Sequence, residues 1–321
     1  MKTGFLDFAT LGPGDLDTAR LEEELDGVAL WDGSSAAEAA ERLAALEVVV
    51  VNKIRLDAQL LDAAPELKLI CLAATGTDNV DLDAARERGI AVCNIRDYCT
   101  PSVEQHVFAL ILALTQHLAN YREQVRTGAW SRSDSFCLLD PPIRELSGKT
   151  LGLIGLGALG SAVAGVARAF NMRVIAARLP WRTMAPPSGS GQSAPRLPLH
   201  ELLQQADVIS LHCPLNDDTR HIIDRAALET MKRDALLINT ARGGLVDYAA
   251  LVEMLEQEEI GGAGIDVLED EPPPADHPLL TADLPNLIVT PHIAWSARES
   301  RQRALNEILE NILAFGRGED R

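Results

Sequence analysis

Ten residues, LGLIGLGALG (151–160), constrain the fold of this 321-residue chain more than any other stretch. They begin as an apolar strand and continue with Gly155, Gly157 and Gly160 in the spacing G-x-G-x-x-G. The first glycine permits a tight turn, the second lets the backbone approach a pyrophosphate, and the third lets a helix pack closely on the strand. The N–H groups at the start of that helix, at Ala158 and Leu159, favour an anion. The motif therefore predicts a parallel α/β domain that binds a dinucleotide.

The residue at the end of the next expected strand indicates which dinucleotide binds. In such folds an acid about 20 residues after the glycines accepts hydrogen bonds from the ribose. This chain has no Asp or Glu between Gly160 and Glu201, and Arg178 follows the apolar stretch 173–177. An arginine there can pair with a 2′-phosphate, with Arg182 as support. The pattern favours NADP over NAD, and a solvated surface arginine is the alternative.

Apolar and amphipathic stretches alternate in two series along the chain. In the first hundred residues the expected strands are 28–31, 47–51, 67–74 and 90–95. In the second series, after the glycine motif, they are 173–177, 207–213, 235–241, 261–267 and 286–292. Strands that alternate with helices predict parallel sheets covered on both faces. We therefore expect an α/β chain with two domains.

Two helices and one loop bear on how these domains are connected. The stretch 101–125 is apolar around much of its circumference and predicts one long buried helix, and 296–318 predicts the last helix. The stretch 184–198 is rich in Pro, Ser and Gly and predicts a surface loop. The domains either follow each other in tandem, or the chain returns to the first domain for its last helix. Periodicity alone does not decide between these arrangements.

Composition and charge argue against several classes of protein. The formal net charge of −18 opposes binding to nucleic acid or to an anionic membrane, and an anionic substrate needs locally placed cations. No apolar run reaches the roughly 18 residues of a membrane span. The N-terminal residues lack the pattern of a signal peptide. Five scattered cysteines without a CxxC pair predict reduced thiols, a cytoplasmic location and no metal site.

Polar residues stand at the ends of three strands in the second series. Arg242 follows one strand, Asp266 and Glu271 follow the next, and His292 lies in a Thr-Pro-His turn after the third. Ligands of doubly wound sheets bind beyond the carboxyl ends of the strands. Each residue alone is a weak signal, but together they supply what hydride transfer to a 2-oxo acid needs. A cation binds the carboxylate, an acid protonates the oxygen, and a glutamate beside the histidine favours its charged form.

Four stretches resemble the D-isomer-specific 2-hydroxyacid dehydrogenase family, closest to its glycerate dehydrogenase/hydroxypyruvate reductase branch. They are AATGTDNVDL, YCTPSVEQHVFALILAL, INTARGGLVD and VTPHIAW. The resemblance spans almost the whole chain. It implies two doubly wound domains, a discontinuous flavodoxin-like substrate domain (1–99 plus 294–321) and an inserted Rossmann nucleotide-binding domain (100–293). It also implies a homodimer and the interconversion of a short D-2-hydroxy acid and its 2-oxo acid, above all hydroxypyruvate or glyoxylate reduction.

The resemblance further implies roles for single residues. Arg242, Glu271 and His292 are the expected catalytic trio, and the backbone N–H groups of Thr75 and Gly76 are expected to bind the substrate carboxylate. Val103 is expected against the nicotinamide, and Asp266 is expected to accept from its carboxamide. The expected cofactor-binding residues are Val103, Gly155, Gly157, Ala158, Leu159, Gly160, Arg178, Arg182, Cys213, Pro214, Thr219, Thr240, Ala241, Asp266 and His292. Lys53 and Trp295 either reach the substrate or are surface or interface residues.

Three other proteins on this scaffold are weighed as alternatives. Formate dehydrogenase pairs its histidine with Gln, where this chain has Glu271. Phosphoglycerate dehydrogenase often carries extra regulatory domains, although short forms exist. A cofactor sensor or co-repressor can keep the whole trio. The intact trio and the lack of basic extensions favour an enzyme, and a turnover assay separates the two classes.

Overall fold

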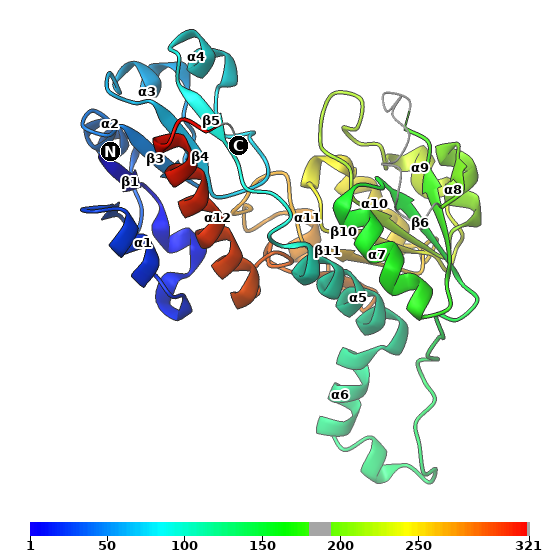
Figure 1. Ribbon diagram of the computed structural model, residues 1–321. Coiled ribbons are helices and arrows are strands. Elements are labelled where there is room, and N and C mark those ends of the chain that lie inside the picture. The colour runs from blue at the N-terminus through cyan, green and yellow to red at the C-terminus, as the bar shows by residue number, and fades with distance from the viewer. Residues whose placement is uncertain (180–193, 320–321) are drawn as a thin grey trace. The chain divides into compact units, whose positions relative to one another are not determined.

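The computed structural model describes residues 1–179 and 194–319 and divides into two compact units (Figure 1). Unit 1 comprises Met1–Cys99 and Trp295–Arg321, and unit 2 comprises Thr100–Ala294. Each unit contains one sheet, and every strand pairing described in either sheet is parallel. The predicted α/β fold class is confirmed. Among the described residues, no helix is long and apolar enough to cross a membrane.

Unit 1 has a five-stranded sheet in the order β2-β1-β3-β4-β5, which is the flavodoxin-like order. Its strands are β1 Thr3–Phe5, β2 Ala29–Leu30, β3 Val48–Val51, β4 Leu69–Leu72 and β5 Ala91–Cys93. Its α-helices are α1 Ala19–Glu24, α2 Ala36–Leu43, α3 Ala58–Asp62, α4 Leu82–Glu87 and α12 Arg298–Gly316. The sequence prediction omitted β1, because Thr3 and Gly4 leave it without the apolar run that marks the other strands.

The last helix completes one face of the unit 1 sheet. In α12, Leu305, Ile308 and Ile312 are buried in one cluster with Val50 of β3 and Leu69 of β4, on the face that also carries α1 (Figure 1). The opposite face carries a second cluster to which α2, α3 and α4 contribute. A sheet buried on both faces explains why β3 and β4 are continuously apolar in sequence.

Unit 2 has a seven-stranded sheet, within the described residues, in the order β12-β11-β10-β9-β6-β7-β8. Counted from β6, this is the Rossmann order 3-2-1-4-5-6 with β12 added at one edge. Its strands are β6 Thr150–Ile154, β7 Arg173–Ala177, β8 Arg196–Leu197, β9 Val208–Leu211, β10 Leu236–Asn239, β11 Gly262–Ile265 and β12 Leu287–Val289. Its α-helices are α5 Thr100–Gln116, α6 Leu118–Arg126, α7 Ala158–Ala169, α8 Leu199–Gln205, α9 Arg225–Thr230, α10 Tyr248–Glu256 and α11 Pro278–Thr281.

The predicted single helix over 101–125 is wrong, because the structure contains two helices. His117 has φ 49° and ψ 41°, a left-handed conformation that ends α5 and starts α6 in a new direction. α5 packs on α7 and on the sheet, whereas no residue of α6 is buried. α6 and the segment after it extend away from the unit 2 sheet (Figure 1). The apolar stretch therefore predicted burial correctly only as far as α5.

The predicted loop over 184–198 is corrected at its end. Arg196–Leu197 forms β8, which pairs with β7 at the edge of the sheet. Arg182 and the rest of the loop up to residue 193 lie outside the described residues.

Candidate active site

The polar residues singled out in unit 2 follow three neighbouring strands. β10, β11 and β12 are parallel and aligned, so that Asn239 pairs with Ile265 and Ile265 pairs with Val289. The carboxyl ends of all three strands therefore lie at the same edge of the sheet. Arg242, Glu271 and His292 each follow one of these ends, and sheet register brings their backbones together.

Glu271 and His292 form a direct side-chain pair. Oε2 of Glu271 lies 2.5 Å from Nδ1 of His292, and both side chains are partly exposed. The other carboxylate oxygen, Oε1, accepts a hydrogen bond from the N–H of Leu268 at 3.0 Å. With one oxygen held by the backbone and the other on the ring, Glu271 fixes the orientation of His292.

The backbone around His292 is held by Asp266, which is only 1% exposed. Its Oδ1 accepts from the N–H of Ile293 at 2.9 Å, and its Oδ2 accepts from the N–H of Ala294 at 2.8 Å. His292 itself has φ 53°, a left-handed conformation, and its N–H donates to the backbone carbonyl of Asp266 at 2.8 Å. Hydrogen bonds on both sides of a strained residue keep it in one conformation.

Two residues that sequence reasoning missed complete this arrangement. Thr290 donates its hydroxyl to Oδ1 of Asp266 at 2.6 Å, and Nε2 of His106 lies 3.1 Å from the same hydroxyl oxygen. Since the single hydroxyl proton points at Asp266, Nε2 of His106 carries a proton that it shares between the Thr290 oxygen and Oδ1 of Asp266, 3.5 Å away. Burial by itself raises the pKa of Asp266. The hydrogen bonds from His106, Thr290 and the backbone outweigh it, and the pKa lies below its ordinary value.

Arg242 stands in a turn held by two buried polar side chains of unit 2. Asn239 is fully buried; its Oδ1 accepts from Ala241 N–H at 3.0 Å and its Nδ2 donates to Arg242 O at 2.9 Å. Asn239 also donates to the Tyr248 hydroxyl, which donates to Val267 O at 2.6 Å. This chain of hydrogen bonds links the arginine turn to the segment that carries Asp266 and Glu271.

Gly243 brings these two segments into backbone contact. A Cβ atom at this position would lie 2.1 Å from the carbonyl carbon of Leu268 and 2.3 Å from the nitrogen of Glu269. No side chain fits at such distances, so the glycine after Arg242 is required for the close approach of the two strand ends.

The glycine loop after β6 has the geometry of a pyrophosphate cradle. Gly155 has φ 106°, and a Cβ on it would lie 2.3 Å from His212 O, whereas a Cβ on Gly160 would lie 2.2 Å from Gly155 O. These two glycines are required by packing. A Cβ on Gly157 would meet nothing within 4 Å, so packing does not require this glycine. Its lack of a side chain leaves open space at the start of α7, where a phosphate group fits. The loop therefore suits a dinucleotide.

Other predicted cofactor residues lie at the ends of β9 and β10. Thr240 has a buried hydroxyl that finds no hydrogen-bond partner among the described residues, as expected of a group awaiting a ligand. Cys213 is buried, and burial raises the pKa of its thiol to about 11. Thr219 is fully buried, and its hydroxyl donates to Pro214 O at 2.8 Å, so it shapes this loop from within. Their contacts with a cofactor remain predictions.

The remaining predicted residues of unit 2 lie on α5 and β7. Val103 is buried in the first turn of α5, next to Ser102, whose hydroxyl donates to Ala294 O at 2.6 Å. That bond ties the start of α5 to the turn of His292. Arg178 is exposed immediately after β7, and its N–H donates to Leu197 O of β8 at 2.7 Å.

The predicted substrate residues of unit 1 follow two neighbouring strands. Lys53 is exposed two residues after β3, and Thr75 and Gly76 follow β4, which pairs with β3. Neither the N–H of Thr75 nor that of Gly76 donates to an acceptor within the described residues. Both amides are therefore suited to an anionic ligand. Trp295, the other residue left open by the sequence, is half-buried in an edge-to-face contact with Tyr98.

Sequence reasoning missed the polar residues whose hydrogen bonds hold the turns of Arg242 and His292. They are Ser102, His106, Asn239, Tyr248 and Thr290. Each stands in or beside a motif that was singled out, but a single polar residue at such a position gives no signal of its own. The signal that identifies them is a buried hydrogen bond, which only the folded chain reveals. A further residue, the partly buried His212, has a pKa lowered to about 4 by desolvation, so its ring is neutral near pH 7.

Comparisons with known proteins show the family to which the chain is similar. The sequence profile described as "D-isomer specific 2-hydroxyacid dehydrogenase, NAD binding domain" matches residues 108–294. A glycerate dehydrogenase of Methylorubrum extorquens is 46% identical over 88% of this chain and 86% of its own length. A hydroxypyruvate reductase of Blautia hydrogenotrophica is 35% identical over 99% of this chain and 98% of its own. The structure of D-lactate dehydrogenase from Aquifex aeolicus, complexed with NAD and lactic acid, superimposes with a TM-score of 0.85 at 31% identity, covering 99% and 96% of the two chains.

The fold and the glycine loop are those of a dinucleotide-binding protein, and the comparisons show an oxidoreductase that uses a nicotinamide cofactor. The chain belongs to the D-isomer specific 2-hydroxyacid dehydrogenase family. Its reaction class is therefore oxidoreduction between a 2-hydroxy acid and a 2-oxo acid, at a CH–OH group. The resemblance seen in the sequence motifs is confirmed, and so is the predicted class of enzyme.

Proposed function

We propose that this enzyme reduces a short 2-oxo acid, hydroxypyruvate or glyoxylate, to the D-2-hydroxy acid. The observation that carries the proposal is the Glu271–His292 pair, which stands at the same sheet edge as Arg242 in the nucleotide-binding unit. The substrate class is supported by the names of relatives, which include a glycerate dehydrogenase and a hydroxypyruvate reductase.

The residues of unit 2 divide the chemistry among them. The reduced nicotinamide, when bound, supplies a hydride to the carbonyl carbon of the substrate. His292 donates a proton from Nε2 to the carbonyl oxygen as negative charge develops there, and is left neutral. Glu271 holds Nδ1 and stabilises the charged ring before the transfer. Arg242 pairs with the substrate carboxylate and polarises the carbonyl group.

Unit 1 supplies the other anion-binding groups in this proposal. The N–H groups of Thr75 and Gly76 bind the substrate carboxylate, and Lys53 adds a positive charge in a chain of net charge −18. We therefore assign unit 1 to substrate binding and unit 2 to nucleotide binding. The five free thiols support a cytoplasmic location for the enzyme.

A turnover assay tests the reaction and its alternatives together. The purified chain is mixed with NADPH or NADH and with hydroxypyruvate, glyoxylate, pyruvate or 3-phosphohydroxypyruvate, and absorbance at the nicotinamide band is followed. Formate with the oxidised cofactors covers the formate dehydrogenase alternative. We expect the highest kcat/KM with hydroxypyruvate or glyoxylate. Cofactor binding without turnover of any acid would favour the sensor instead.

We further propose a preference for NADPH. It is supported by the exposed Arg178 at the end of β7 and by the absence of any Asp or Glu from residue 161 to 200 of the sequence. Arg178→Asp should lower the ratio of kcat/KM for NADPH to that for NADH by about tenfold or more, since it replaces a phosphate partner with a repelling charge. Arg173→Asp, at the other end of β7, is the control. An unchanged ratio in Arg178→Asp makes this arginine a surface charge only.

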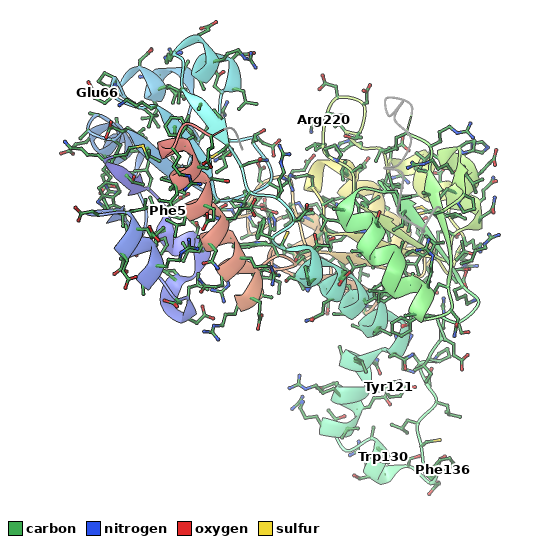
Figure 2. The ribbon with its side chains drawn as sticks, viewed as in Figure 1. Phe5, Glu66, Tyr121, Trp130, Phe136 and Arg220 are labelled. Atoms are coloured by element: carbon green, nitrogen blue, oxygen red, sulfur yellow. The ribbon has the colours of Figure 1, made fainter. Side chains whose placement is uncertain are left out.

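Finally, we propose that the enzyme is a homodimer formed through the segment 118–146, which we call the arm. Large apolar side chains of the arm are strongly exposed, and Figure 2 shows Trp130 and Phe136 at its far end. The exposed residues are Leu118, Val125, Trp130, Phe136, Leu139 and Ile143. Such a patch on one segment is typical of a protein interface, and a second copy offers a matching patch by two-fold symmetry.

The arm proposal is tested by the mass of the protein in solution. The double variant Phe136→Asp, Leu139→Asp places two charges among residues that are 89% and 80% exposed in the single chain. We expect light scattering to give twice the chain mass for the unmodified protein and the chain mass for this variant. Leu280→Asp, at an exposed apolar position of α11, is the control. A monomeric unmodified protein contradicts the proposal.

A further inference from the structure

In unit 1, the carboxylate of Asp7 holds the loop that carries Lys53. Asp7 follows β1 and is only 4% exposed. Its Oδ1 accepts from the N–H of Asn52 at 2.9 Å, and its Oδ2 accepts from the N–H of Lys53 at 2.6 Å and from that of Ile54 at 3.1 Å. Three successive amides on one carboxylate fix the path of the backbone through this loop.

The carbonyl groups of the same loop are held by Asn79, in the loop that follows β4. Its Nδ2 donates to Ile54 O at 2.9 Å and to Asn52 O at 3.4 Å. The backbone carbonyl of Asn79 accepts a hydrogen bond from the N–H of Leu56 at 2.8 Å. Asn79 is three residues after Gly76. One side chain therefore ties the loop of Lys53 to the loop of Thr75 and Gly76.

The other side of the second loop is also anchored. The Thr75 hydroxyl donates to Ile95 O at 2.9 Å, and Asn94 Nδ2 donates to Thr75 O at 2.7 Å. The side-chain hydroxyl and the carbonyl of Thr75 are thus both used to hold the loop. The two amides assigned to the substrate donate to none of these anchors.

Burying a carboxylate beside an anion-binding loop needs a compensating gain. Removal of a charge from water is costly unless hydrogen bonds replace the lost hydration, and here three amides do so. These bonds join the end of β1 to residues 52–54, which follow the neighbouring strand β3. Their effect is to preorganise one loop, which reduces the entropy lost when a small ligand binds.

We propose that Asp7 is a positioning residue for the 2-oxo acid, an inference that rests on the proposed function. Asp7 fixes the backbone of Lys53 and, through Asn79, the amides of Thr75 and Gly76, so that the substrate carboxylate meets donors already in place. Asp7 does not itself touch the substrate in this proposal. Its loss weakens substrate binding and leaves the proton and hydride transfers of unit 2 intact.

Asp7→Asn tests this directly, because it keeps the side-chain volume but replaces one accepting oxygen with an NH2 group. Losing hydrogen bonds to a charged acceptor should raise the KM for the 2-oxo acid about tenfold or more. The kcat should stay within about twofold, because the transferring groups are unchanged. The Kd for NADPH should not change. Asp57→Asn is the matched control, since Asp57 accepts one backbone N–H, from Leu60, as the cap of α3 in the same unit.

A second variant and a binding probe keep the test independent of turnover. Asn79→Ala removes the bonds to the carbonyl groups and should raise KM about threefold or more, as expected for neutral hydrogen bonds. Oxalate has two adjacent carboxylates and therefore resembles the carboxylate and carbonyl group of a 2-oxo acid. It is titrated calorimetrically into each variant in the presence of NADP⁺. Its Kd should rise by the same factors as KM. Hydrogen exchange of amides 52–54 should be faster in Asp7→Asn.

The outcomes separate this proposal from the proposed function. Unmodified protein that binds oxalate but reduces none of the acids contradicts the proposed function alone, and the oxalate series then decides the role of Asp7. Unchanged KM and oxalate affinity in Asp7→Asn, together with faster exchange at 52–54, overturn the positioning role. An equal rise in KM for Asp57→Asn also overturns it. If Asp7→Asn does not fold, an unchanged KM in Asn79→Ala overturns the positioning role instead.

Discussion

Asp7 in unit 1 and Asp266 in unit 2 are two buried carboxylates with similar positions in their sheets. Each lies just after one strand and accepts backbone N–H groups from the loop after the neighbouring strand. Asp7 follows β1 and holds the loop after β3, whereas Asp266 follows β11 and holds the turn after β12. In both units a carboxylate at the end of a parallel strand holds the backbone of the loop beside it.

The two carboxylates differ in what their loops carry and in how they are surrounded. The loop held by Asp7 carries groups assigned to binding, whereas the turn held by Asp266 carries His292, assigned to proton transfer. Asp266 has side-chain donors as well, from Thr290 and His106. We therefore expect damage at Asp7 to appear in KM and damage at Asp266 to appear in kcat. The comparison therefore predicts that substitutions at the two carboxylates change different kinetic constants, which mutagenesis can test.

The largest effect is expected when the proton donor itself is removed. His292→Asn should lower kcat about 10²- to 10⁴-fold, the usual contribution of a positioned acid. Asparagine is chosen because it tolerates the left-handed conformation that His292 adopts at φ 53°. The Kd for NADPH should be unchanged, and His200→Asn, on the exposed side of α8, should have normal kinetics. Near-normal turnover of His292→Asn would remove the proposed mechanism.

A smaller loss of kcat is expected for Asp266→Asn, which keeps His292 but loosens its turn. We expect kcat to fall about 10- to 100-fold, because misplacement of a catalytic group by even 1 Å has a cost of this order. KM for the 2-oxo acid should change less than kcat. A larger change in KM than in kcat would abolish the contrast with Asp7.

The same variant makes a prediction about acid stability. The pKa of Asp266 lies below its ordinary value in the folded chain. The ionised group therefore stabilises the fold above its unfolded pKa of about 3.9, and this stabilisation is lost as pH falls through the folded pKa. The difference in Tm between the unmodified protein and Asp266→Asn should be largest near neutral pH and shrink below about pH 4. A difference that does not vary with pH argues against ionised Asp266 as its source.

The smallest effect on turnover is expected for Tyr248→Phe, which cuts the link between the arginine turn and Val267. Two buried groups, Asn239 Nδ2 and Val267 O, lose a partner, so the free energy of unfolding should fall by about 1–3 kcal/mol. We expect kcat/KM to fall only a few-fold. Urea unfolding measures the free energy of unfolding of the variant. Tyr121→Phe, which removes a hydroxyl that donates to Pro141 on the arm, should cost less and leave kinetics unchanged.

Much of the fold could be predicted because its signals are local. The glycine spacing at Gly155, Gly157 and Gly160 and the alternation of apolar strands with helices specify two parallel sheets. The errors have local causes too. β1 contains Thr3 and Gly4 and lacks an apolar run, and the break at His117 depends on one left-handed residue in an otherwise helical sequence. β8 lies within a stretch whose composition is typical of a loop.

Arg242, Glu271 and His292 could be singled out from the sequence because each follows an apolar strand, and their catalytic roles stay predictions. The 2.5 Å pairing of Glu271 with His292 and the close contact behind Gly243 could not, because they depend on the register of three strands. The same holds for Asp7, which lies 46 residues from Lys53 in sequence. The sequence by itself determined which chemical groups stand at the strand ends. Only the tertiary structure decided which buried carboxylate holds each loop, since that depends on which strand ends become neighbours.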